Sequence, residues 1–254
     1  MRKIIAALFV MIATSGSLLP YNSIAQETEQ AKSTNVKWIF GITGGLSVPF
    51  GNYVKADYDN SKSGFAKAGS DFGVTATYFL NKNFGISALI SYHKYAFNGV
   101  QNMANGLKES FDVDSVYLET NGDNHVLNIL VGPYYSIPAG KRLSVDFRVL
   151  IGLANASLAG NNVILTDGGV TDPEFYQKPA TATTFALQAG AGLRYNISNS
   201  FGIMLNADYF YSKPNFKIDN VDRLNNAGRK IDNYNEPIAC INTNITLVYL
   251  LRHK

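Results

Sequence analysis

The chain has 254 residues with 22 basic and 19 acidic side chains, and its only cysteine is Cys240. The length suits one domain better than two separate domains. The nearly balanced charge argues against a nucleic-acid partner, because such partners bind basic patches. One cysteine cannot form an internal disulfide framework, so the fold has to be stabilised by other contacts.

The N-terminus has the pattern of a secretory signal peptide. Arg2 and Lys3 precede an apolar run, Ile4–Thr14, and small residues at Ser23 and Ala25 mark a cleavage site. A membrane anchor is the alternative, but the run is too short to span a bilayer. We therefore expect a signal peptide over residues 1–25, a periplasmic N-terminal tail over 26–36 and a mature domain over 37–254.

A hairpin between Phe185 and Tyr211 shows the pattern that recurs along the chain. About ten residues alternate between apolar and small or polar side chains, a polar turn follows near Ile197–Ser200, and about ten more residues alternate. This length matches a tilted strand that crosses a bilayer.

The same pattern predicts eight strands, joined by connections that are alternately long and short. Short periplasmic turns and long external loops are typical of bacterial outer-membrane barrels. Pro133 cannot donate a ladder hydrogen bond, so we expect a strand end or a bulge there. The expected strands are Trp38–Phe50, Asp71–Leu80, Phe84–His93, Asn124–Ile137, Leu143–Ala154, Phe185–Tyr195, Phe201–Tyr211 and Ile238–Leu251, with irregular loops over 51–70, 97–123, 157–181 and 212–237.

The apolar face is expected to point outward, to lipid. A soluble lipocalin-like barrel would alternate too, but with its apolar face inward, and it would then expose the aromatic residues to water as a large patch. These aromatics instead fall into two bands at the strand ends, as interfacial girdles do. The interfacial set is Trp38, Tyr78, Phe84, Tyr92, Tyr135, Tyr195, Phe201, Tyr209, Tyr211 and Tyr249, with Phe40, Phe50, Phe72 and Phe185 in the same bands.

The opposite face carries charges that need partners inside a narrow barrel. Arg148 and Arg194 are expected to pair with Asp146 and Asp208 as a structural network. A second set with inward parity should fill the ends of the interior, and a ligand pocket at the mouth is the alternative. This second set is Phe79, Tyr134, Phe210 and Leu250.

Catalytic and metal chemistry find little support in the sequence. His93 follows Ser91 on one strand face, but the sequence places no third group that would complete a nucleophilic site. One cysteine and the scattered His93, His125 and His253 lack metal-ligand spacing. We therefore expect a protein that is not an enzyme and that has no metal and no cofactor.

Two segments, FGITGGLSVPFGNY (40–53) and FALQAGAGLRYNISNSFGIMLNADY (185–209), resemble the small outer-membrane β-barrel domain proteins of Bacteroidota. This group includes PorT-like proteins and the OmpA-like eight-stranded barrels. The resemblance implies insertion into the outer-membrane bilayer by the barrel assembly machinery, and it implies no common function. Three functions stay open: a structural or surface barrel whose extracellular loops bind a ligand or protein, a small pore or uptake accessory, and a PorT-like accessory of a secretion system.

Overall fold

The computed structural model describes residues 36–60, 63–97, 99–222 and 228–252. The expected signal peptide and residues 26–35 of the expected tail lie outside these described residues, as does His253. In the described part of the chain, no helix is long and apolar enough to cross a membrane.

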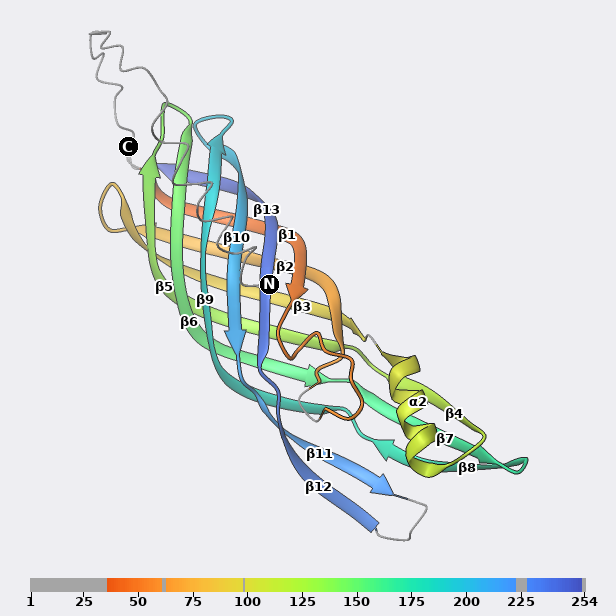
Figure 1. Cartoon of the computed structure of the whole chain (residues 1–254). Helices are drawn as coiled ribbons and strands as arrows, with labels where there is room; N and C mark the ends of the chain where they lie inside the picture. The colour runs from red at the N-terminus through yellow and green to blue at the C-terminus, as the bar shows by residue number, and fades with distance from the viewer. Residues whose placement is uncertain (1–35, 61–62, 98, 223–227, 253–254) are drawn as a thin grey trace, which may run out of the picture. The chain divides into compact units, whose positions relative to one another are not determined.

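Eight antiparallel strands close into an up-and-down barrel (Figure 1), which confirms the predicted fold class. Each strand pairs with its neighbours along the chain, and the ladder from Val36↔Arg252 to Pro49↔Cys240 joins the first strand to the last. In a closed barrel every strand has two partners, so no edge is left unpaired. The barrel strands are β1 (Val36–Pro49), β2 (Ala66–Phe79), β3 (Phe84–Phe97), β5 (Asn124–Pro138), β6 (Leu143–Leu158), β9 (Ala180–Asn196), β10 (Phe201–Ser212) and β13 (Ile238–Arg252).

The connections alternate in length as the sequence predicts. Short turns at 80–83, 139–142 and 197–200 gather at one end of the barrel, which we call the turn end. The four long connections gather at the opposite end, which we call the loop end, and the strands reach farther toward it than expected. For example, β2 begins at Ala66 and not at Asp71.

The prediction that the long connections are irregular is wrong. They contain the helix α2 and a second sheet with the strand order β12-β11-β8-β7-β4, which lies beyond the loop end in Figure 1. Their strands pair across long sequence separations, such as Ser115↔Thr166, and each strand is too short to give a clear signal by itself. The elements are α2 (Val100–Phe111), β4 (Ser115–Asn121), β7 (Gly160–Asp167), β8 (Val170–Gln177), β11 (Asn215–Asp222) and β12 (Gly228–Asn235).

The prediction of a strand end or bulge at Pro133 is also wrong. Pro133 lies inside β5 and pairs with Ile86 of β3. On the other side, the ladder to β6 passes from Val131↔Ile151 to Tyr134↔Arg148 without a register shift. The missing N–H therefore weakens pairing locally but does not interrupt the strand.

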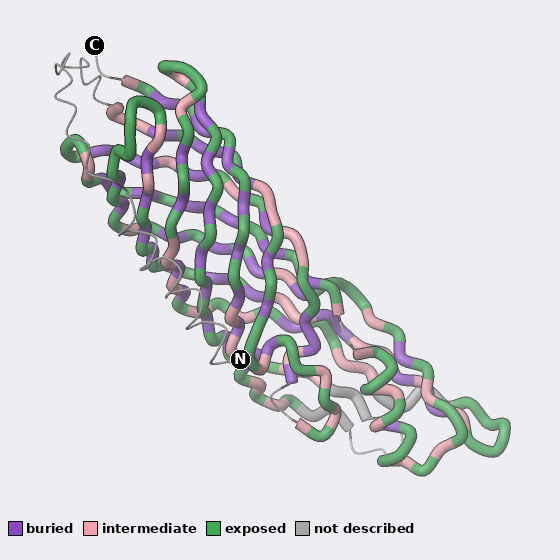
Figure 2. The backbone as a smooth tube through the Cα atoms, turned by 45° about the horizontal axis from the view of Figure 1, so that its top comes forward, coloured by how far each residue is buried: buried purple, intermediate pink, exposed green. Residues whose placement is uncertain are grey.

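Buried and exposed residues alternate along the barrel strands (Figure 2), and the apolar side chains are the exposed ones. Ile42 and Leu247 are 70% and 64% exposed, whereas their sequence neighbours Thr43 and Thr246 are buried. An outward apolar surface and a polar interior are the inverse of a soluble barrel and suit a lipid environment. The predicted orientation of the two faces is thus confirmed.

Candidate functional site

Arg148 and Asp208 form a bidentate ion pair inside the barrel. Arg148 Nε donates to Asp208 Oδ1 at 2.7 Å, and Nη2 donates to Oδ2 at 2.5 Å, with both side chains buried. The two residues belong to β6 and β10, and the guanidinium passes over Gly190 of the intervening β9, which pairs in register with both. A Cβ on Gly190 would lie 2.2 Å from Asp208 Oδ1, so the pair requires glycine at that position.

Arg194 and Asp146 form a second buried pair nearer the turn end. Arg194 Nε donates to Asp146 Oδ2 at 2.8 Å, and Nη2 donates to Ser136 Oγ at 3.0 Å. The structure therefore places the four charged residues proposed from the sequence as two separate pairs, each joining one arginine to one aspartate. Hydrogen bonds such as the one from Arg194 to Ser136 are needed, because Coulomb attraction alone rarely offsets the desolvation of buried ions.

Sequence reasoning missed a third buried pair, Asp71 with His93. Asp71 Oδ1 lies 3.2 Å from His93 Nε2, and Asn244 Nδ2 donates to Asp71 Oδ2 at 2.8 Å. Asp71 and His93 are direct cross-strand partners in the β2–β3 hairpin. The short turn at 81–83 sets the register of the hairpin, and the alternation already placed both residues on the inward face. Counting back from this turn along both strands would have predicted the pair.

The buried Ser91–His93 pair does not have the geometry of a nucleophilic site. Ser91 Oγ lies 3.4 Å from His93 Nε2, which is also the nitrogen closest to Asp71. A nucleophile–base–acid relay needs the hydroxyl and the acid on opposite ring nitrogens. Tyr95 Oη, at 3.3 Å, occupies the side of Nδ1 instead. Across the described residues, no group of three or more His, Cys, Asp or Glu is arranged to hold a metal ion.

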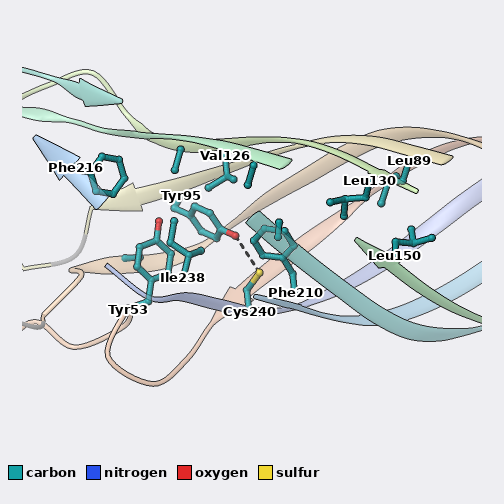
Figure 3. Packing of buried hydrophobic residues seen from close by; sticks show 14 of the residues in the cluster. Tyr53, Leu89, Tyr95, Val126, Leu130, Leu150, Phe210, Phe216, Ile238 and Cys240 are labelled. Atoms are coloured by element: carbon teal, nitrogen blue, oxygen red, sulfur yellow. Dashed lines mark hydrogen bonds between the residues drawn. The ribbon is translucent and has the colours of Figure 1, made fainter. Parts of the chain in front are cut away.

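Apolar layers fill the lumen at both ends. Near the turn end, Phe79 packs edge-on against Tyr134, with ring centroids 5.8 Å apart, and Leu250 joins the same buried cluster. Toward the loop end, Phe210 belongs to a larger buried cluster that includes Tyr53, Tyr95, Phe216 and Ile238 (Figure 3), where Tyr95 Oη donates to Cys240 Sγ at 3.2 Å. These positions agree with the expectation that the four inward residues fill the ends of the interior.

The outward aromatics lie near both ends of the barrel wall, where the sequence placed them. Toward the turn end, Trp38 contacts Tyr78 with ring centroids 4.8 Å apart, and Phe201 contacts Tyr249 at 5.3 Å. The remaining members of the interfacial set are also at least partly exposed: Phe84, Tyr92, Tyr135, Tyr195, Tyr209 and Tyr211.

A tyrosine hydroxyl beside a buried carboxyl group links two of the long connections at the loop end. Tyr234 Oη lies within hydrogen-bond distance of Glu236 Oε2 and 3.2 Å from the carbonyl oxygen of Ser63. A tyrosine hydroxyl has one hydrogen, so a protonated Glu236 is needed to satisfy both contacts. Burial raises the pKa of Glu236 to about 7, although the hydrogen bond with Tyr234 opposes the shift. Tyr234 thereby joins the β10–β13 connection to the β1–β2 connection, and a protonated Glu236 lets the Tyr234 hydroxyl donate to Ser63.

Replacing Arg194 with Leu should lower the free energy of unfolding by about 3–5 kcal/mol, because Asp146 would be left buried without its cation. The matched control is Lys94→Leu, which breaks a half-exposed pair with Asp123 and should cost far less, because water screens the pair. Urea titration of the refolded protein in lipid vesicles measures both values. A loss no larger for Arg194→Leu than for the control would contradict a structural role for the buried pair.

The folded protein should lose stability as the pH rises from about 4.5 to about 7. Over this range the unfolded state releases the Glu236 proton, with an ordinary pKa of 4.5, while the folded state keeps it up to about 7. Glu236→Gln should remove this part of the pH dependence and be more stable than the native chain above neutral pH. The exposed Glu119 provides the control Glu119→Gln, and equal slopes of unfolding free energy against pH in all three proteins would disprove the assignment.

Comparison with known proteins places the chain in a family. Residues 25–235 match the model of the outer membrane protein beta-barrel domain. No curated protein sequence matches the chain. Among solved structures, the chain is similar to Ail, the attachment invasion locus protein of Yersinia pestis (14% identity, TM-score 0.41, covering 85% of this chain and 98% of that one). It is also similar to a major outer membrane protein from Thermus thermophilus (10% identity, TM-score 0.47, covering 84% of this chain and 99% of that one). A third similar structure is the outer membrane protease OmpT from Escherichia coli (10% identity, TM-score 0.46, covering 86% of this chain and 98% of that one). Because the family model covers most of its length, the chain belongs to the outer membrane protein beta-barrel domain family.

Proposed function

We propose that this protein is a non-enzymatic barrel of the bacterial outer membrane that binds a ligand or a partner protein at its loop end. The observation that carries the proposal is the sheet β12-β11-β8-β7-β4, which the long connections build beyond a barrel with a filled lumen. Long loops that only joined strands would not need regular secondary structure, because a long flexible loop costs little free energy by itself.

The proposed orientation sets the loop end outside the cell and the turn end in the periplasm, with residues 1–25 removed as a signal peptide on export. The three short turns at one end support this orientation, since outer-membrane barrels have short periplasmic turns. The barrel assembly machinery is the proposed partner during insertion.

The burial and the pairing of the interior polar residues support a role that is not enzymatic. Ser91 and His93 are buried between the apolar layers, where a substrate could reach them only if the packing opened. Among the described residues, the buried arginines and aspartates of the lumen face a partner of opposite charge or a histidine and are not free to act on a reacting group. We accordingly propose no cofactor and no metal.

Of the two other functions, a pore is disfavoured by the two apolar layers across the lumen. The PorT-like secretion accessory rests on the resemblance of segments 40–53 and 185–209 and stays a prediction. It is compatible with the proposed function, because an accessory of a secretion system would also use the loop-end or turn-end surface to contact a partner.

Purified protein in planar bilayers should show no single-channel conductance steps, because both apolar layers and the buried ion pairs block the lumen. Replacing Phe79 and Tyr134 together with Ala opens only the turn-end layer and should leave the barrel closed. Reproducible conductance steps from the native protein, absent from protein-free bilayers, would favour the pore instead.

A photoreactive residue at Tyr117 should form adducts with a partner on intact cells. Tyr117 is 63% exposed on the outer face of β4, so a reactive group there samples the surroundings of the loop-end sheet. The same residue at Ser198, exposed in the β9–β10 turn at the opposite end of the barrel, is the matched control. Adducts at neither position, or at Ser198 alone, would overturn binding at the loop end.

A further inference from the structure

We propose that the mouth of the loop end holds a binding site for a small uncharged molecule that carries an aromatic ring. The inference rests on the proposed function and deepens it, since it gives a ligand class for the same end of the barrel. It is carried by a cavity of about 250 Å³ that lies among the long connections.

All four long connections contribute to this cavity. Phe65 comes from the β1–β2 connection just before β2, Met103 from α2, Gln177 from the end of β8 and Tyr234 from β12. A space enclosed by four separate connections exists only when all of them are folded together, as expected for a site and not for a gap within one loop. Its volume is slightly below the roughly 300–1,000 Å³ of pockets for drug-sized ligands, which limits the ligand to about one ring system.

The lining of the cavity selects against charged ligands. None of the described residues that line it is charged, although Lys55, Asp57 and Asp59 lie close by along the β1–β2 connection. Moving an ion into this space would cost its hydration without offering a counter-charge. Amide groups of Asn124 and Gln177 and the hydroxyl of Ser63 remain as polar groups that can orient a neutral ligand.

The walls are suited to a flat ring. Phe65 and Phe97 stack with ring centroids 5.5 Å apart and an angle of 17° between their planes, and both line the cavity together with Tyr58. Aromatic rings attract one another in offset or edge-on contact, and the thioether of Met103 adds a polarizable contact that adapts to ring shape.

Hydrogen bonds between the connections hold the cavity in its shape. Tyr234 contacts the Ser63 carbonyl and Glu236, and the Ala159 N–H donates to Asn124 Oδ1 at 2.9 Å. On the adjoining side, Asn102 Nδ2 donates to the Ala56 carbonyl at 2.9 Å and fixes α2 against the β1–β2 connection. A site formed in advance loses less conformational entropy on binding than one assembled around the ligand.

The test is ¹⁹F NMR of 4-fluorophenol added to the full-length protein in lipid nanodiscs at slightly acid pH, where Glu236 carries its proton. The native protein should broaden and shift the fluorine resonance beyond the effect of empty nanodiscs. Met103→Trp fills the cavity from α2 and should weaken binding at least about tenfold. Gln101→Trp, which adds the same ring on the exposed side of α2, should bind like the native protein.

Ala159→Leu fills the cavity from another wall, so the conclusion does not depend on the folding of one variant. The anionic 4-fluorobenzoate and the cationic 4-fluorobenzylammonium should bind at least about tenfold more weakly than 4-fluorophenol. The proposal is overturned if the native protein has no effect beyond empty nanodiscs, if both filled variants bind like the native protein, or if the charged analogues bind equally well.

This experiment contains no partner protein, so its failure is distinguishable from failure of the proposed function. Adducts at Tyr117 together with no 4-fluorophenol binding would remove the small-molecule site and leave the loop-end binding surface intact. Binding of 4-fluorophenol without adducts at Tyr117 would keep the small-molecule site and remove the partner-binding surface at the loop end.

Discussion

Closure of β1 against β13 is the constraint on which the rest of this structure depends. In a bilayer no water is available to unpaired backbone N–H and C=O groups, so a sheet must join its own edges. Closure gives every barrel strand one face toward lipid and one toward the lumen. The apolar positions, such as Ile42 and Leu247, then have to point outward, and every polar or charged side chain on the other face has to find a partner inside.

The narrow lumen of an eight-stranded barrel decides how those partners are arranged. Large side chains fit only where a neighbouring strand supplies a small residue, as Gly190 does beneath Arg148 and Asp208. Ion pairs and amide hydrogen bonds share the middle of the lumen with Leu89, Leu130 and Leu150, while the apolar side chains around Tyr134 and Phe210 fill its ends. Such an interior holds the barrel rigid and leaves little room for transport or catalysis, so the surfaces available for function lie at the ends.

At the loop end the connections contain many more residues than are needed to join the barrel strands. Their strands pair into a sheet, and α2 packs its buried Leu107 into a small apolar cluster with Leu118 and Val163. The hydroxyl of Tyr234 contacts Ser63 and so ties two connections together. Gly106 of α2 lies so close to the Tyr58 ring that a Cβ would be 2.3 Å from it, which shows how tightly the helix is docked. A rigid set of connections on a rigid barrel is well suited to hold a binding surface and a cavity in fixed geometry.

Alternation and turn spacing in the sequence by themselves determined the strand number, the orientation of the two faces and the candidate charges Asp146, Arg148, Arg194 and Asp208, because a period of two assigns each residue to one side of the wall. Only the tertiary structure decided which arginine meets which aspartate, since Arg148 reaches Asp208 across an intervening strand through the register of two ladders. It also decided the loop-end sheet and the cavity. Pairs such as Ser115↔Thr166 join segments far apart in the chain, and a contact of that kind leaves no local period by which the sequence could reveal it.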